Sequence, residues 1–178
     1  RANGGTESGN GGFVETSSQG MLNFIGNVVA AARNGRAGTL LLDPETMTIQ
    51  SGGGTDLNGS LVSGNAITAL LRSGTNVSLL ATQSITVNDL VDGRPAATGD
   101  AATSGALSMN AGSIVINQPV ITSNAGIALA ATTGDVTIQG AGFLYVANGA
   151  SGVGNGAVNI QAQGVIRTLA TSADTGQG

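Results

Sequence analysis

The sequence predicts an all-β fold: a parallel β-helix, in which short strands stack in successive turns. Three observations support this prediction. Segments of alternating apolar and polar residues recur along the chain, and this period of two is typical of strands. Glycine, which supplies 30 of the 178 residues, and asparagine bound these segments, and both tolerate tight corners. Aromatic residues make up only 2% of the chain, which favours a narrow core of small aliphatic side chains.

The regular part of the repeat lies between residues 105 and 170. Three segments there begin with glycine and end with an amide: GSIVIN (112–117), GDVTIQ (134–139) and GAVNIQ (156–161). Their glycines are 22 residues apart on both intervals. Three short strands in so little chain make one turn of a parallel β-helix, because a hairpin sandwich needs a longer repeat.

This alignment predicts two columns of side chains along the stack. The core column consists of Ile116, Ile138 and Ile160. The second is a structural amide ladder at the ends of the strands, formed by Gln50, Asn88, Asn117, Gln139 and Gln161. In stacked turns each amide can bond the next, as in cross-β assemblies. The alternative is that Asn and Gln are there because they favour corners.

A short helix is predicted near residues 64–73, against the side of the β-helix. Three apolar residues at positions i, i+3 and i+4 share one helical face: Ile67, Leu70 and Leu71. Ser63 can serve as the N-cap, and Gly74 stands where a C′ glycine belongs.

We expect residues 1–178 to form a single β-helix segment cut from a longer protein. Its turns are irregular over residues 1–88 and regular over 105–170, with a loop excursion near 88–105 that is rich in aspartate and carries Arg94 and Pro95. For residues 21–33, two short strands are favoured over a helix because Gly26, Asn27 and adjacent valines disfavour one.

The composition excludes most catalytic chemistry. The chain has no His, Cys or Lys, so it lacks Ser-His and Cys-His pairs, thiolate metal sites and Schiff-base lysines. Six arginines against ten acidic residues give a net charge of −4 with no basic run, which argues against nucleic-acid binding. The sequence therefore predicts no catalytic residue, no cofactor and no enzyme activity.

Only weak site candidates remain. Three aspartates of the 88–105 excursion could hold calcium: Asp89, Asp92 and Asp100. More commonly, such residues simply belong to a solvated loop. Asp43 and Glu45 are the nearest pair of acids for glycoside chemistry, but they flank a proline, which favours a structural turn. Asn58 and Asn76 begin N-glycosylation sequons, a weak signal in a chain rich in Asn and Ser.

Two stretches carry a specific resemblance, GGFVETS (11–17) and GRAGTLLLDPETMTI (35–49). Together they resemble the large secreted adhesins of the filamentous haemagglutinin type, which are passengers of two-partner secretion in Gram-negative bacteria. Residues 67–78 and 84–87 are similar to the segment that commonly follows in these adhesins. The resemblance covers residues 11 to 88, whereas 105–170 is generic for their repeats.

The resemblance implies a right-handed parallel β-helix within an elongated shaft at the bacterial cell surface. It implies a structural and adhesive role, with host or bacterial surface molecules (protein or glycan) as partners and an outer-membrane secretion partner for the full-length protein. Two alternatives are a self-assembling fibre or biofilm matrix subunit, since cut ends expose strand edges, and a polysaccharide-acting β-helix enzyme.

Overall fold

The computed structural model describes residues 1–20, 22–24, 28–51, 57–58, 61–98, 100–147 and 156–170. Within these ranges the chain is mostly β, with fifteen strands and a single short helix. The strands before the helix are β1 (Phe13–Ser17), β2 (Asn23–Phe24), β3 (Thr39–Asp43), β4 (Thr46–Gln50), β5 (Leu57–Asn58) and β6 (Leu61–Ser63). After the helix α1 (Gly64–Arg72) come β7 (Asn76–Val87), β8 (Val91–Asp92), β9 (Leu107–Ile116), β10 (Val120–Ser123), β11 (Ile127–Ala131), β12 (Val136–Gly140), β13 (Leu144–Ala147), β14 (Val158–Ala162) and β15 (Ile166–Ala170).

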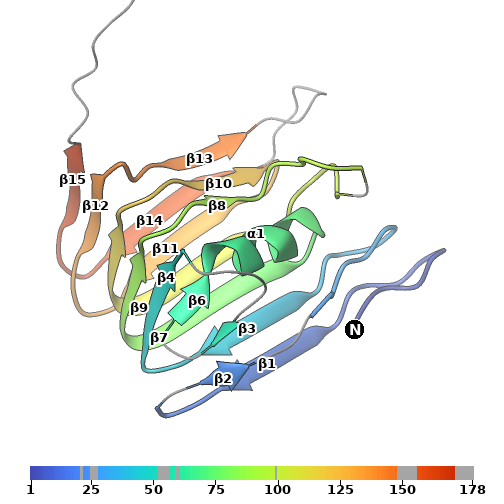
Figure 1. The fold of residues 1–178 in the computed structure, drawn as a ribbon, viewed down its shortest axis with the longest axis horizontal. Coiled ribbons are helices and arrows are strands. Elements are labelled where there is room, and N and C mark those ends of the chain that lie inside the picture. Colours follow the sequence, from blue (N-terminus) through green and yellow to red (C-terminus); the bar gives the residue numbers. More distant parts are fainter. Residues whose placement is uncertain are drawn as a thin grey trace, which may run out of the picture.

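Parallel pairing arranges these strands in three rows (Figure 1). The first row is β1, β3, the N-terminal half of β7, the N-terminal half of β9, β11 and β14. The second row is β6, β4, the C-terminal halves of β7 and β9, β12 and β15. The third row is β8, β10 and β13. From β7 onward the chain passes through the first, second and third rows in that order and then repeats the order.

The second row continues beyond β6 in a different way. Strand β5 pairs with β6, and β2 pairs with β5, and both pairings are antiparallel. Two short strands were predicted for residues 21–33. One strand is present there, the two-residue strand β2, and residues 28–32 have no regular secondary structure. The remaining positions of that stretch, 21 and 25–27, lie outside the described residues.

Inward-facing side chains of the first two rows make an aliphatic core. In the first row, Val77, Leu107 and Ile127 are register partners and all three are buried. In the second row, Ile85, Ile114 and Val136 stack in the same way and are fully buried. Because each strand alternates, its other side chains face outward, and this explains the apolar–polar pattern in the sequence.

Helix α1 forms where it was predicted and lies alongside β8, the strand at that end of the third row (Figure 1). Its C-terminus is a Schellman motif: the Gly74 amide donates to the Leu71 carbonyl (2.9 Å) and the Thr75 amide to the Leu70 carbonyl (3.1 Å). Gly74 has the positive φ (79°) that this motif requires. The predicted N-cap is wrong in one respect, because Ser63 holds the position but its side chain makes no capping hydrogen bond.

The register corrects the predicted core column. Ile116 pairs with Ile138, but Ile160 pairs with Leu129 in the first row. The second-row partner of Ile138 is instead Thr168. The repeat is uneven: 20 residues separate the partners Leu107 and Ile127, while 31 separate Ile127 from Val158. All strands share one alternating pattern, so a fixed 22-residue spacing assigned β14 to the wrong row.

The loop excursion is shorter than predicted. The prediction began it at residue 88, but β8 pairs with β10 and so belongs to the third row. The chain leaves the row after Asp92 and returns at Leu107, where β9 begins. The return requires a glycine, because a Cβ on Gly105 would collide with the Thr75 carbonyl.

Candidate functional site

Three of the five predicted ladder residues form a ladder. The Asn117 side-chain amide donates to Asn88 Oδ1 (2.6 Å), and the Gln139 side-chain amide donates to Asn117 Oδ1 (3.0 Å). The backbone supports this stacking, because the Asn117 amide also donates to the Val87 carbonyl (2.9 Å). The ladder stands at the corner between the second and third rows, where β7, β9 and β12 end.

The other two predicted ladder residues do not extend these hydrogen bonds. Gln50 ends β4, and Asn88 follows the neighbouring strand in line with it, because the Asn88 amide donates to the Ile49 carbonyl (2.6 Å). No side-chain hydrogen bond joins these two amides in the described part of the chain. The prediction that Gln161 belongs to the ladder is wrong. Gln161 pairs with Ala130 in the first row, so it lies on a different side of the stack from Gln139.

The three aspartates proposed for calcium are used separately. The Asp89 carboxylate accepts from the Leu90 amide (2.9 Å), and the Asp100 carboxylate accepts from the amides of Ala96 (2.8 Å) and Ala97 (3.0 Å). These two amides hold the pKa of Asp100 below its ordinary value. Within the described residues, no group of three or more acidic side chains is placed to hold a metal ion.

Asp89 instead lies at the N-terminus of α1. A Cβ on Gly64, the first residue of the helix, would lie only 2.5 Å from Asp89 Oδ2 and 2.8 Å from the Leu90 carbonyl oxygen. A side chain at this position would therefore displace the carboxylate. A negative charge at a helix N-terminus is favourable, so the position of Asp89 favours the start of the helix.

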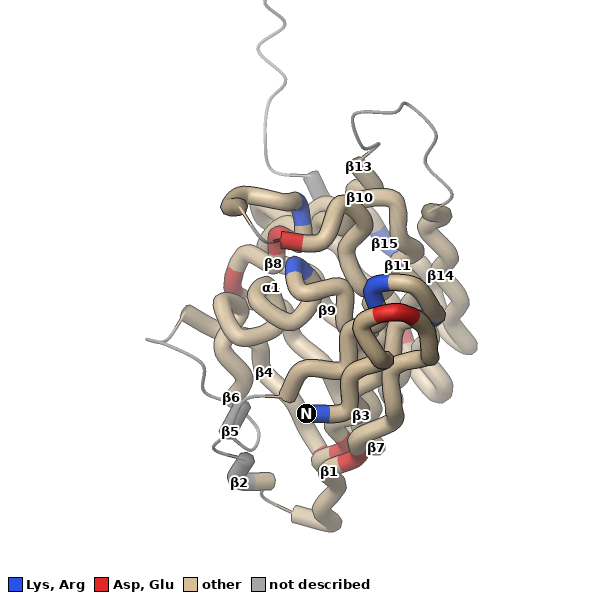
Figure 2. Tube along the Cα trace, turned by 90° about the vertical axis from the view of Figure 1, so that its right-hand side faces the viewer, with Lys and Arg blue, Asp and Glu red and all other residues tan. Residues whose placement is uncertain are grey.

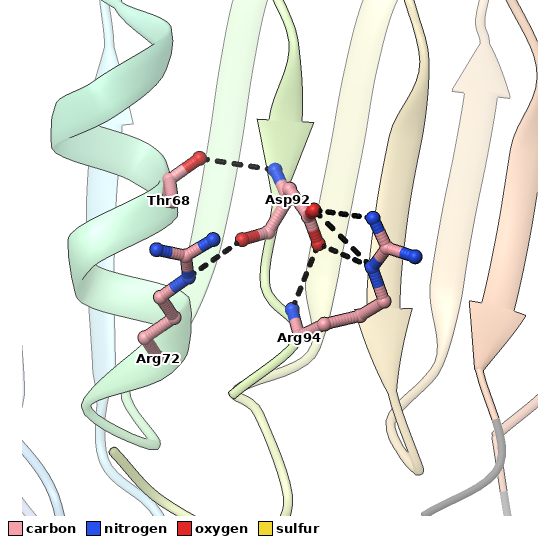
Figure 3. Close-up of polar contacts among 4 residues, drawn as sticks. All are labelled: Thr68, Arg72, Asp92 and Arg94. Carbon is pink, nitrogen blue, oxygen red and sulfur yellow. Dashed lines mark hydrogen bonds and ion pairs between the residues drawn. The ribbon is translucent and has the colours of Figure 1, made fainter. Parts of the chain in front are cut away.

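Asp92 joins α1 to the third row (Figure 3). Its backbone amide donates to Thr68 Oγ1 (3.0 Å), and its carbonyl accepts from Arg72 Nε (3.0 Å). Its carboxylate accepts from Arg94 Nε (2.9 Å), Arg94 Nη2 (2.7 Å) and the Arg94 amide (3.0 Å). The hydrogen bond from the Arg94 guanidinium is the main reason that the pKa of Asp92 lies below its ordinary value.

The paired acids at residues 43 and 45 lie at a corner of the stack, as the turn interpretation predicts. Asp43 ends β3, and Glu45 follows two residues later, after Pro44. Glu45 Oε1 accepts from Gln83 Nε2 (2.6 Å), and the Gln83 amide donates to the Glu45 carbonyl (2.9 Å). Glu45 therefore bonds the equivalent corner of the next layer, which is a structural role.

The two sequons differ in what can be described. The side chain of Asn76 bridges neighbouring layers, because its Nδ2 donates to the Ala37 carbonyl (3.3 Å) and its Oδ1 accepts from the Ala106 amide (2.9 Å). A glycan on Nδ2 would have to displace the first of these bonds. The side chain of Asn58 lies outside the described residues.

The structure contains a surface feature that the sequence analysis missed. Phe143 and Tyr145 point outward from the third row, and Leu90 lies exposed on the same row. The signal was present in the alternation of Phe143, Leu144 and Tyr145, since only Leu144 packs against the core.

Charged residues and grooves add little further chemistry. Most of the trace in Figure 2 is neither acidic nor basic, and the ion pairs among the described residues are Arg94–Asp92 (2.7 Å) and Arg167–Asp135 (3.3 Å). A groove of about 670 Å³ lies between residues 31–37 and 100–104, lined mainly by Ala, Gly and Ser. No helix in the described ranges is long and apolar enough to cross a membrane.

We predict that Asn117→Ala destabilises the protein by about 1–2 kcal/mol, because two amide hydrogen bonds are lost from the middle of the ladder. Gln161→Ala is the matched control, an exposed amide outside the ladder, and its effect should be within about 0.5 kcal/mol. Urea unfolding followed by circular dichroism measures both. Equal losses in the two variants would contradict a stabilising ladder.

We predict that Asp92→Asn removes a small part of the pH dependence of stability. The folded carboxyl has a pKa below its ordinary 3.8, so its contribution is complete above that value and is lost as pH falls through the lower folded pKa. The size is about 1 kcal/mol or less, because the Arg94 side chain is half exposed. Melting temperatures of both proteins across acidic pH test this; parallel curves would disprove it.

Comparisons of the chain with protein-family models, with curated proteins and with solved structures find no match. The resemblance to haemagglutinin-type adhesins therefore stays an expectation from residues 11–17 and 35–49.

Proposed function

We propose that this chain is a segment of the shaft of a secreted bacterial cell-surface adhesin, folded as a right-handed parallel β-helix. The role is structural and adhesive: stacked turns give length, and the outer faces and corners present contact surfaces. Host or bacterial surface molecules are the partners, and the full-length protein uses an outer-membrane secretion partner. No enzymatic activity, cofactor or nucleic-acid partner is part of this proposal.

The order in which the chain visits the three rows is the observation that carries the proposal. Strands β9 and β10, then β11, β12 and β13, each complete one pass through all three rows, and each row keeps parallel register from one pass to the next. Repeated passes of this kind support a β-helix, in which each pass would be one turn. Right-handed connections are the strong preference for parallel strands, which supports the proposed hand.

The chemistry of the surface supports a passive role over catalysis. The acids that could serve a polysaccharide-acting enzyme are engaged in structure: Glu45 bonds a neighbouring corner and Asp92 bonds Arg94. Glycoside hydrolysis requires two carboxyl groups facing one substrate bond. Among the described residues, Asp43 and Glu45 share one corner, where Glu45 is bonded to Gln83, and Asp92 stands elsewhere beside Arg94, which favours contact without turnover.

The adhesive part of the proposal is tested with beads coated with the purified chain. We predict that coated beads attach to epithelial or bacterial cells, and that replacing residues 95–102 by a short Gly/Ser linker reduces attachment if the excursion is the contact site. Beads coated with albumin are the control. Attachment no better than the control would refute an adhesive role for this segment, and undiminished attachment of the loop variant would exclude the excursion as its contact site.

Self-assembly into fibres is the second candidate, and the exposed end of the stack favours it. Ile166 in β15 is 48% exposed, although its register partner Val136 is fully buried. Val158 in β14 is likewise exposed above a buried partner, Ile127. No described strand pairs with the outer edges of β13, β14 and β15, and open edges of this kind invite further pairing.

If the chain self-assembles through this end, Ile166→Asp should lower its sedimentation coefficient toward that of a monomer, because a charge would be buried in the contact. Leu169→Asp is the matched control, since Leu169 is equally exposed on β15 but faces outward from the stack. Sedimentation velocity over a wide concentration range provides the measurement. A wild-type chain that is monomeric throughout would eliminate this candidate.

A further inference from the structure

We propose that the outer face of the third row is a binding platform for a neutral glycan, with Phe143 and Tyr145 stacking on pyranose rings. This inference rests on the adhesive function proposed above, and it names the ligand class and the residues. The platform consists of Leu90, Pro119, Phe143, Tyr145 and the Asp92–Arg94 pair.

The aromatic residues are placed for stacking. The chain has three Phe and one Tyr, yet two of these four lie two residues apart on one face. Phe143 is 47% and Tyr145 50% exposed, while Leu144 between them packs inward. Alternate residues of a strand point to one side, about 7 Å apart. The two rings therefore form a shared apolar surface, and their negative faces attract the C–H groups of a sugar ring.

The strand register extends this surface across the row. Tyr145 pairs with Ile121, and Ile121 pairs with Asp92, so these residues occupy one outward column, in which Ile121 itself is buried between its neighbours (4% exposed). The Val91 amide donates to the Pro119 carbonyl (3.0 Å), and the Val120 amide donates to the Phe143 carbonyl (2.9 Å). Leu90, Pro119 and Phe143 therefore form the adjacent column. Adjacent exposed apolar residues of this kind mark a binding surface more often than isolated ones.

Polar groups flank the apolar columns on two sides. The Asp92 carboxylate and the Arg94 guanidinium lie at one end of the Tyr145 column, about 10 Å away across two strand spacings. The amide ladder lies at the other side, because Asn88, Asn117 and Gln139 come two to four residues before Leu90, Pro119 and Phe143. Amides, a carboxylate and a guanidinium are the donors and acceptors that sugar hydroxyl groups require.

The charge of this face selects a neutral ligand. Strands β8, β10 and β13 carry one charged residue, Asp92, and Arg94 pairs with it at 2.7 Å. The hydrogen bond to Asp92 raises the pKa of Arg94 further, and a guanidinium is ionised at neutral pH in any case. Arg72, whose Nε donates to the Asp92 carbonyl (3.0 Å), adds one cation beside the pair. The face therefore offers a single unpaired positive charge and no basic cluster for an acidic polymer such as heparin, and a basic peptide would meet no excess of negative charge.

The outward direction of these side chains also distinguishes them from the exposed end of the stack. Ile166 and Val158 are exposed because no described strand covers them, so a further layer would bury them. Phe143 and Tyr145 face away from the core, so a further layer would lie beside them and would not bury them from the core side. Flanking layers still reduce exposure in this row, because Ile121, the partner of Tyr145 with a strand on each side, is only 4% exposed.

Affinity electrophoresis with the full chain tests the proposal. Native gels contain hydroxyethylcellulose, galactomannan, laminarin or dextran as neutral probes, and heparin or polygalacturonate as acidic probes. We expect at least one neutral polysaccharide to retard the chain, and Phe143→Ala and Tyr145→Ala each to weaken that binding about tenfold or more, as truncation of a central aromatic contact does. Phe13→Ala is the matched control, because Phe13 is 62% exposed on β1, in a different row, and should leave binding unchanged.

Three outcomes would overturn the inference: retardation by acidic polymers alone, no retardation by any neutral probe, or equal loss in the Phe13→Ala variant. Circular dichroism of each variant verifies that the fold is intact. Bead attachment separates this proposal from the adhesive function. Attachment that persists in a variant lacking both aromatics would retain the adhesive role and remove the glycan platform, and attachment to protein-coated but not glycan-coated surfaces would do the same.

Discussion

Parallel backbone pairing between successive layers is the constraint on which the rest of the structure depends. It sets one strand directly beside the next, so every side chain has a fixed partner in the layers on either side. Inward partners such as Leu79, Met109 and Leu129 then have to be apolar and similar in size. Outward partners are free to vary unless, like Asn117 and Gln139, they bond one another. The same pairing thus organises both the core and the surface.

The corners supply the polar half of this arrangement. Glu45 and Gln83 link one pair of corners, and Asn88 and Asn117 link another, so side-chain hydrogen bonds continue the layer-to-layer pattern of the backbone. Helix α1 follows the same principle by a different route. It lies beside β8, and Asp92 connects the two through backbone and side-chain bonds. A helix can end a row of strands because the side chains of Thr68 and Arg72 satisfy the backbone amide and carbonyl of Asp92, which a further strand would otherwise have bonded.

These features join the two functional proposals. A stack whose polar groups are consumed in holding layers together has little left for catalysis, which agrees with a chain that lacks His, Cys and Lys. What it can offer is a long surface with repeating geometry. The exposed aromatics of β13, flanked by the amide ladder and by the Asp92–Arg94 pair, are the part of that surface with the clearest recognition chemistry.

The sequence by itself determined the all-β class and helix α1 with its glycine C-terminus, because these depend on local periodicity and on residues close in the chain. The repeat also predicted the ladder of Asn88, Asn117 and Gln139, but their bonds join residues 29 and 22 positions apart and form only because the strands stack. Only the tertiary structure decided which strand joins which row. Ile160 and Gln161 have the same local pattern as Ile138 and Gln139, yet they belong to the first row, because the spacing between partners varies from 20 to 37 residues in that row. Period-two alternation predicts which side chains of a strand face the core and which face solvent, but it does not predict which strand lies next to it.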